Sequence, residues 1–325
     1  MTTMKERLLQ QFHLLQAIRD FFKHQNFLDV LTPPAVENPG METHIHPFKL
    51  HSVAKNTDIP YYLHTSPEFH MKELLSLGFE KIFTMSYCFR DEPSSPIHRF
   101  QFLMLEWYRA NTRYEKIMDD CEALIKSCSM QMQEKGFSVK KEILNCNFER
   151  RTIQELFWEY LKIDILQFLE TKELRKLIEK DFTDVPLPKD NSIMAWDDYY
   201  FLLFLNKIEN QLIHRPYLLL HQFPHHLSAL STLKKDDLRV CERFEIYLSG
   251  VELCNCFNEL TDLTIQKERF LMQQLEKKKL YGYELPPANL LYQSLERGLP
   301  PSSGIAMGIE RLLLSLVETS NPFFK

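Results

Sequence analysis

Two widely separated segments constrain what this chain of 325 residues can fold into. Residues 89–109 read FRDEPSSPIHRFQFLMLEWYR, which places an Arg, a Glu and a His ahead of a β-prone aromatic run. Residues 303–316 read SGIAMGIERLLLSL, a glycine-punctuated strand followed by an apolar helix that carries an Arg. The chain has only eight glycines, and Gly304 and Gly308 both fall in this strand. Their position indicates that the backbone approaches a ligand closely there.

The first segment has the groups that a nucleotide needs. Arg90 and Glu92 are alternate residues, so on a strand they face the same way and can address one ligand. An Arg fork bonds two phosphate oxygens and stabilises charge as it develops. An isolated R-x-E pair is more often a surface ion pair, but here His98 and Phe102 follow it. Phe102 would offer an aromatic face to a purine ring, and His98 would donate to a terminal phosphate.

Composition limits the class of protein. The chain is 44% hydrophobic and 26% charged, which is typical of a globular protein. It has no apolar run long enough for a transmembrane helix, and its N-terminal segment is amphipathic and unlike a signal peptide. We therefore expect a cytoplasmic protein with no membrane partner. The formal net charge is −5 and no basic stripe is evident, which counts mildly against a large nucleic-acid surface.

The cysteines and histidines predict no metal or disulfide framework. Seven cysteines without framework spacing argue against disulfides, and we expect Cys254 and Cys256 to be small buried residues. Six histidines lack partner carboxylates at metal-ligand spacing and are expected to be structural: His44, His46, His51, His221, His225 and His226.

The pattern along the chain predicts a mixture of helices and strands. Apolar residues at helical spacing predict an opening helix that ends near Gln25. Thr65 and Ser66 precede Pro67 and Glu68, which predicts a capped helix start. The other predicted elements are a strand at 27–36, a hairpin at 44–64, a helix at 66–77, strands at 83–90 and 100–109, mostly helix at 115–180, a strand pair at 243–248 and 251–257, a helix at 260–280, and a strand and helix after a proline-rich loop.

Taken together, the two segments resemble the second and third signature motifs of class II aminoacyl-tRNA synthetases, with Arg311 as a second phosphate-binding Arg. Pro33 lies where the first motif has its proline, which in that superfamily marks a dimer interface. Within class II the chain is most similar to the lysine branch, and especially to the family of free-standing elongation factor P–(R)-β-lysine ligases. The resemblance is densest at 65–75, 89–109, 239–262 and 303–316.

This resemblance implies an α+β fold with a mostly antiparallel sheet flanked by helices. It implies one catalytic domain over 1–325 with no anticodon-binding domain, and a homodimer. ATP and Mg²⁺ would be the cofactors. The residues that the resemblance assigns to ATP are Arg90, Glu92, His98, Arg99, Phe102, Glu252, Leu253, Gly308 and Arg311, of which Arg90 and Arg311 would be catalytic.

Glu245, Glu252 and Glu259 recur every seven residues. On spacing alone they would be one solvated helix face, but the intervening sequence is too β-prone and rich in Cys and Phe for that. By resemblance, Glu245 and Glu252 hold Mg²⁺, a hard cation suited to carboxylate oxygens. Glu259 would bind the side-chain ammonium of a lysine-like substrate. The resemblance assigns further substrate contacts to Ser66, Glu68, Glu106, Tyr108, Asn255 and Ala306.

Two details favour the ligases over lysine–tRNA synthetases. The chain opens directly on the helix before the first motif, and Ala306 stands where the synthetases have Gly. The methyl of Ala306 would reject an α-amino group and tolerate a β-amino group. The second motif departs from the family, since Arg99, Phe100 and Gln101 replace Asn-Pro-Glu. Cys256 also replaces the customary Gly after Asn255.

The resemblance implies an ATP-dependent ligase that activates (R)-β-lysine as an adenylate and transfers it to a lysine of elongation factor P. Such a ligase does not attach its amino acid to tRNA, so tRNA is not expected as a partner. Two alternatives stay open. One is a lysine–tRNA ligase without an anticodon domain, and the other is a non-catalytic synthetase paralogue that binds an amino acid or a partner.

Overall fold

A computed structural model of the chain describes residues 3–95, 98–140, 143, 148–188, 194–319 and 322–323. Pro96 and Ile97, in the middle of the predicted phosphate-binding loop, lie outside the described residues. The chain divides into two compact units, the first made of Met1–Asn145 and Asn258–Lys325, the second of Cys146–Phe257. The single domain expected from the sequence stays a prediction.

The first unit opens on helix α1 (Met4–His24), where the sequence predicts it. Thr3 accepts from the backbone N–H of Glu6, and the Glu6 carboxylate accepts from the backbone of Thr3, which forms a capping box. The expected strand at 27–36 is instead two short strands, β1 (Leu28–Asp29) and β2 (Ala35–Val36). Pro33 and Pro34 lie between them and have no N–H to donate to a ladder.

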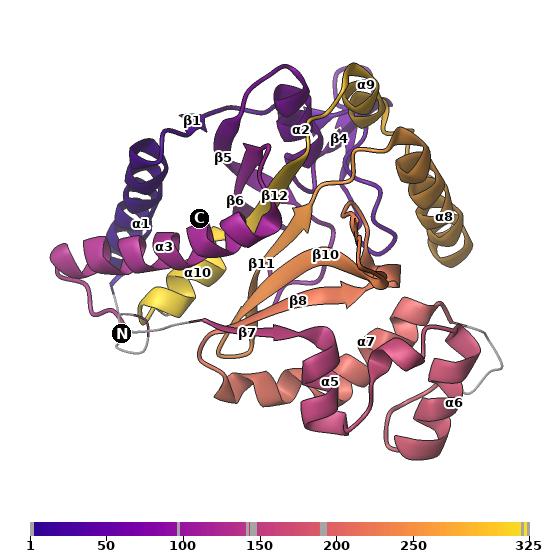
Figure 1. Ribbon diagram of the computed structural model, residues 1–325. Helices are drawn as coiled ribbons and strands as arrows, with labels where there is room; N and C mark the ends of the chain where they lie inside the picture. Colours follow the sequence, from indigo (N-terminus) through magenta and orange to yellow (C-terminus); the bar gives the residue numbers. More distant parts are fainter. Residues whose placement is uncertain are drawn as a thin grey trace. The chain divides into compact units, whose positions relative to one another are not determined.

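The central sheet of the first unit has the order β1-β5-β6-β12 (Figure 1). Strand β1 is parallel to β5 (Lys81–Phe89), and β6 (Gln101–Ala110) is antiparallel to both β5 and β12 (Ser302–Gly308). The predicted strands at 83–90 and 100–109 are thus confirmed. A second sheet has the order β2-β4-β3, in which β3 (Lys49–Ser52) and β4 (Thr57–Leu63) form the predicted hairpin.

Side chains along β6 alternate between the two faces of this sheet. Trp107 packs on the face of α1, where its ring lies 5.3 Å from that of Phe22. Phe83, opposite Trp107 in the ladder, stacks on Phe22 at 4.6 Å. Glu106 and Tyr108 therefore point to the other face. One face is an aromatic core, and the other carries buried polar groups.

The described part of this unit also contains α2 (Glu68–Ser76), α3 (Tyr114–Glu134), α8 (Leu263–Tyr281), α9 (Asn289–Arg297) and α10 (Ile309–Leu316). The expected side-chain cap of α2 is wrong, because its N-cap is Pro67 and no side chain caps the helix. Helix α9 lies just after the proline-rich loop and was not predicted.

In the described part of the second unit, the strands lie in the order β11-β10-β8-β7, and β9 pairs with β10 beside this path. The predicted strand pair is confirmed as β10 (Asp237–Leu248) and β11 (Val251–Asn258), joined at Ser249 and Gly250, which both have positive φ. The remaining elements are β7 (Glu149–Thr152), α5 (Ile153–Leu161), η1 (Ile165–Gln167), α6 (Thr171–Asp181), α7 (Trp196–Lys207), η2 (Glu209–His214), β8 (Leu218–Pro224), η3 (His225–Leu227) and β9 (Leu233–Lys234).

An aromatic stack forms part of the core of the second unit. The ring of Tyr200 lies 5.4 Å from that of Phe157 and 5.4 Å from that of Trp196. The indole N–H of Trp196 donates to the carbonyl of Phe168 at 2.8 Å. This hydrogen bond satisfies the polar end of a buried side chain.

The cysteine prediction is confirmed for the described residues, where Cys254 and Cys256 are buried and carry free thiols. No helix within the described ranges has both the length and the apolar character needed to cross a bilayer.

A buried ion pair ties β6 to α3. Arg109 Nε and Nη2 donate to the two carboxylate oxygens of Asp120 at 2.6 and 2.9 Å, and both side chains are less than one-tenth exposed. The guanidinium also lies 4.6 Å from the ring centre of Phe27. Paired oxygens and a fork-shaped donor make the geometry bidentate.

We predict that Asp120→Ala destabilises the first unit by about 3–5 kcal/mol, because it leaves the Arg109 charge buried without its partner. Chemical denaturation followed by tryptophan fluorescence measures the change. A double variant, Asp120→Leu with Arg109→Met, should recover much of the loss, since no charge is then buried alone. If Asp120→Ala lowers the free energy of unfolding by less than about 1 kcal/mol, the Arg109 charge is not left uncompensated and the prediction is wrong.

Candidate active site

The polar face of β6 and β12 forms the floor of a candidate site. In the ladder Gly304 lies opposite Tyr108, and Ala306 lies opposite Glu106, so all four residues share one face. A Cβ at Gly304 would lie 2.0 Å from Cε1 of Tyr108 and 2.6 Å from Oε1 of Glu259. Position 304 is therefore a glycine because Tyr108 and Glu259 approach its backbone closely.

Three buried carboxylates and one ammonium meet above this floor. Lys72 Nζ, from α2, lies 2.7 Å from Oε1 of Glu68 and 2.7 Å from Oε2 of Glu259. Tyr108 donates its hydroxyl to Oε2 of Glu106 at 3.1 Å. The structure thus brings together Glu68, Glu106, Tyr108 and Glu259, as the resemblance implied. Sequence reasoning gave Lys72 no role, although its position four residues after Glu68 on a helix was a usable signal.

Burial shifts the ionisation of this cluster. Burial, with a smaller contribution from Glu68, raises the pKa of Glu106 well above its ordinary value. Burial raises the pKa of Glu259 to about 7, although Lys72 opposes that shift. Burial also lowers the pKa of Lys72, but the attraction of Glu259 and Glu68 outweighs it and the net shift is upward. Near neutral pH, Lys72 is charged and Glu259 is in its titration range, and the raised pKa of Glu106 favours its neutral form.

The cluster has unused acceptors. Among the described residues, no side chain donates to Oε1 of Glu106 or to Oε1 of Glu259, although both atoms are buried. The backbone of Gly304 does make a hydrogen bond with the Glu259 carboxylate, which lowers its pKa. A buried acceptor without a donor is costly in a folded protein unless a ligand supplies one. An ammonium group has three donors and one positive charge, so it fits this site.

The phosphate-binding residues expected from the sequence form two contacts. The Arg90 guanidinium lies 5.2 Å from the ring centre of Phe102, and Arg311 Nη2 donates to His98 Nε2 at 3.0 Å. Burial, and then the positive charge of Arg311, lowers the pKa of His98, which favours the neutral acceptor form. Arg90 Nε is buried and has no hydrogen-bond partner in the described part of the chain, so it is available to an anion.

Arg99 is placed differently from the expectation. Its Nη1 donates to the carbonyl of His98 at 2.8 Å and also bonds the carbonyl of Ser95, and its guanidinium lies 4.5 Å from the ring centre of Phe323. The side chain therefore folds back on its own loop. Its role in ATP binding stays a prediction.

Glu310, which the sequence analysis did not select, joins the two motifs. Its carboxylate oxygens accept from the backbone N–H of Leu103 at 2.8 and 3.1 Å. Burial raises the pKa of Glu310 to about 7, and the Leu103 hydrogen bond opposes that shift. This contact holds the first turn of α10, which carries Arg311, against β6. Gly308 is the N-cap of the same helix.

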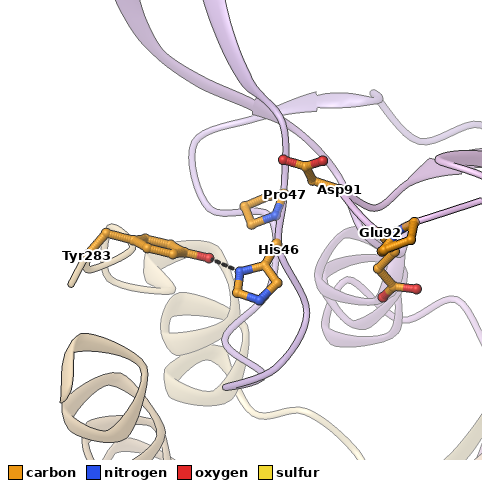
Figure 2. A pocket seen from close by; sticks show the side chains of 6 residues that line it. His46, Pro47, Asp91, Glu92 and Tyr283 are labelled. Carbon is orange, nitrogen blue, oxygen red and sulfur yellow. Dashed lines mark hydrogen bonds between the residues drawn. The ribbon is translucent and has the colours of Figure 1, made fainter. Parts of the chain in front are cut away.

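Ser66 and Glu92, which are also expected in the site, lie two residues from Glu68 and from Arg90 in the sequence. Ser66 is half-buried, just before α2. Glu92 lines a pocket of about 550 Å³ together with His46, Pro47, Asp91, Pro93 and Tyr283 (Figure 2). The Nδ1 atom of His46 lies 2.7 Å from the Tyr283 hydroxyl, as the dashed line in Figure 2 shows. From the sequence His46 is expected to be structural and Tyr283 has no expected role, so neither position in this pocket follows from the motifs.

The second unit holds the remaining expected residues. Glu245 lies opposite Asn255 in the β10–β11 ladder, and Glu252 lies opposite Tyr247. Asn255 is the third residue after Glu252, which would place the two on opposite faces of a regular strand. A bulge near Leu253 adds one residue and brings both to the face of Glu245.

The Glu245 carboxylate is already held by its neighbours. Its Oε2 accepts from the Tyr247 hydroxyl at 2.8 Å, and its Oε1 bonds Arg243 Nη2. Arg243 Nε also donates to Oδ1 of Asn255 at 3.0 Å. Burial raises the pKa of Glu245, the charge of Arg243 lowers it, and Glu252 raises it further.

These two carboxylates fit Mg²⁺ only in part. Two hard oxygen ligands on one face are what Mg²⁺ takes from a protein when phosphates complete its shell. The described residues contain no group of three or more His, Cys, Asp or Glu side chains able to hold a metal without such help. Glu245 and Glu252 could therefore serve Mg²⁺ only together with a phosphate ligand.

Comparison with known proteins assigns the class. The family described as tRNA synthetases class II (D, K and N) matches residues 1–321, so the chain belongs to this family. The expected α+β fold, with a mostly antiparallel sheet flanked by helices, is the catalytic fold of this family and is confirmed. Membership also makes the chain an ATP-using protein of the ligase type.

Individual relatives are more specific. The chain is 31% identical to the elongation factor P–(R)-beta-lysine ligase of Hamiltonella defensa, over 97% of this chain and 92% of that protein. It is 33% identical to the same-named ligase of Vibrio cholerae, over 95% and 90%. It is also 32% identical to the lysine–tRNA ligase of Magnetococcus marinus, over 98% of this chain but 63% of that protein.

We predict that a lysine-like ligand binds more weakly as the pH falls through the pKa of Glu259, about 7. Protonation removes the charge that attracts the ammonium, so the Kd should rise about tenfold per pH unit below that value. Lys72 stays charged over this range. Calorimetric titration with lysine between pH 5.5 and 8 measures the profile, and a flat profile would exclude the role of Glu259.

We predict that Gly304→Ala weakens amino-acid binding by about 1–3 kcal/mol, because the new methyl overpacks against Tyr108 and Glu259. The KM for the amino acid should rise while the KM for ATP changes little, since neither residue touches the Arg90–Phe102 pair. Steady-state ATP–pyrophosphate exchange gives both constants. An equal rise in both would point to general misfolding instead.

Proposed function

We propose that this chain is an ATP-dependent ligase that activates (R)-β-lysine as an adenylate and transfers it to a lysine side chain of elongation factor P. The observation that carries the proposal is the buried carboxylate cluster of Glu68, Glu106 and Glu259. It lies on the sheet face that also carries Phe102 of β6. The similarity to ligases of that name over at least nine-tenths of their length supports it.

The first step joins the amino acid to ATP. A carboxylate oxygen of the amino acid attacks the α-phosphorus, an O–P bond forms, and the bond to pyrophosphate breaks. Arg90 would stabilise the charge on the α-phosphate, and its unpartnered Nε is a donor for that purpose. Arg311 would bind the outgoing phosphates. Positioning and electrostatics are sufficient for this step, and no side chain forms a covalent intermediate.

The second step forms an amide. The lysine amine of the acceptor, in its neutral form, attacks the carbonyl carbon of the adenylate. A C–N bond forms, the C–O bond to AMP breaks, AMP leaves as the anion and one proton is released from the new nitrogen. The structure assigns no general base to this proton, and solvent can take it.

Mg²⁺ belongs to the proposal, with Glu245 and Glu252 as its protein ligands. When bound, it would neutralise phosphate charge on ATP. Arg243 and Tyr247 would hold the Glu245 carboxylate in position.

Ala306 supports the choice of a β-amino acid. Its methyl stands opposite Glu106 on the face of the carboxylate cluster. An extra methyl there would reject a neighbouring α-amino group by about 1–3 kcal/mol and leave room for a shifted amino group.

The single catalytic domain over 1–325, a homodimer and a cytoplasmic location complete the proposal. Leu28 and Leu31, beside the proline of the first motif, are 50% and 93% exposed. Exposed apolar side chains at this position are consistent with a covered surface in a dimer.

The test is the intact mass of purified elongation factor P after incubation with this protein, ATP, Mg²⁺ and (R)-β-lysine. We expect a gain of one lysyl group on the acceptor, because the amide bond is stable to mass analysis. A parallel reaction offers α-lysine and bulk tRNA. Charged tRNA with unmodified protein would favour the lysine–tRNA ligase, and no product in either reaction would favour the non-catalytic paralogue.

Arg311→Ala provides the matched inactive control. It removes a phosphate-binding charge from α10 without touching the carboxylate cluster, so ATP–pyrophosphate exchange should fall at least about a hundredfold. Thermal unfolding should stay close to that of the unsubstituted protein.

A further inference from the structure

Lys72 is among the least exposed charged groups of the described chain, with 1% of its surface accessible. Removing an ammonium from water costs several kcal/mol unless partners compensate for it. Here the compensation comes from Glu68 and Glu259, each 2.7 Å from Nζ. A structural lysine would be satisfied by any acceptors, but these two carboxylates are the ones proposed to contact the substrate.

The two oxygens of Glu259 have different surroundings. Oε2 lies against Lys72, whereas Oε1 faces the backbone of Gly304, where a Cβ would lie 2.6 Å away. The Tyr108 ring borders the same point, since its Cε1 would be 2.0 Å from that Cβ. Oε1 is buried and accepts from no side chain among the described residues, while a backbone hydrogen bond from Gly304 lowers the pKa of this carboxylate. Lys72 therefore occupies one side of the carboxylate, and no described side chain donates to the other.

We propose that Lys72 is a positioning residue for substrate selection: by holding Oε2 of Glu259, it directs Oε1 toward Gly304 and Tyr108 to receive the substrate ammonium. Lys72 itself does not touch the substrate. This inference rests on the proposed function, because it takes the substrate to be an amino acid with a cationic side chain.

The charges of the cluster agree with this role. Glu68 and Glu259 carry two negative charges when ionised, Lys72 carries one positive charge, and Glu106 is neutral when protonated. Among these four groups one negative charge is then left over, which matches one ammonium group. The neighbouring Glu42 has a pKa raised by burial and by the charge of Glu68, which favours its neutral form. Without Lys72 the two carboxylates would repel each other, and the pKa of Glu259 would rise further above its present value of about 7. The carboxylate would then be protonated at neutral pH and a poor partner for an ammonium.

The opposite role is that Lys72 occupies the place of the substrate ammonium and must leave before the substrate binds. The two roles predict opposite results. A positioning lysine makes binding tighter, so its loss raises the Kd. A competing lysine makes binding weaker, so its loss lowers the Kd.

The test compares Lys72→Met with the unsubstituted protein by calorimetric titration with (R)-β-lysine and α-lysine. We expect the Kd to rise about 10- to 100-fold at pH 7, as for loss of a charge-assisted contact. The rise should shrink as the pH is raised, because Glu259 then ionises without help. ATP binding should change less than about twofold. An unchanged or lower Kd for the amino acid would overturn the inference.

Two further variants separate positioning from folding. Lys72→Arg keeps the charge and should recover part of the affinity, which a purely steric role of the lysine stem would not predict. Lys277→Met removes another buried ammonium, one that donates to the Ile45 carbonyl at 2.7 Å outside this cluster. Its amino-acid Kd should stay within about twofold. If Lys277→Met loses as much affinity as Lys72→Met, a general loss of stability is the cause and the inference fails.

Failure of the proposed function is distinguishable from failure of this inference. If elongation factor P is not modified but lysine binds and Lys72→Met weakens it, only the acceptor is wrong. If lysine does not bind the unsubstituted protein at all, both are overturned. If modification proceeds and Lys72→Met binds lysine normally, only the role of Lys72 is wrong.

Discussion

The two-residue period of β6 is the constraint on which the described site depends. Successive side chains of a strand point to opposite faces, so one strand can serve a dry core and a polar cluster together. Trp107 packs against Phe22 on one side, while Glu106 and Tyr108 line the other. A shift of one residue in register would bury the carboxylate in the aromatic core and expose the indole to the site. The register with β12 is therefore as important to the chemistry as the side chains are.

Burying carboxylates requires compensation, and the structure provides it in two ways. Lys72 neutralises charge at Glu68 and Glu259, whereas burial raises the pKa of Glu106, which favours its neutral form, and Tyr108 donates a hydrogen bond to it. In both cases one oxygen accepts from no side chain among the described residues. A cationic ligand that donates there would complete the network.

Several parts of the fold could be predicted from sequence because their signals are local. The periodicity of residues 4–24 predicts α1, and alternating aromatic residues predict β5 and β6. The short strands β1 and β2 differ from the single strand expected, because Pro33 and Pro34 interrupt the ladder. The predicted side-chain cap of α2 is also wrong, since no side chain caps this helix. A serine before proline is only a candidate cap, and whether its oxygen reaches the helix depends on the turn geometry.

By itself, the sequence determined the family, the order of the elements and the residue types that phosphate and ammonium groups require. These follow from short motifs and periods, which depend on neighbours along the chain. Tertiary structure decided which acceptors stay unpaired and which cation compensates them. Lys72 and Glu259 are far apart in sequence, and their contact depends on where α2 packs on the sheet. Likewise, only the bulge in β11 places Glu252 and Asn255 on one face, because the face of a residue depends on the ladder it joins.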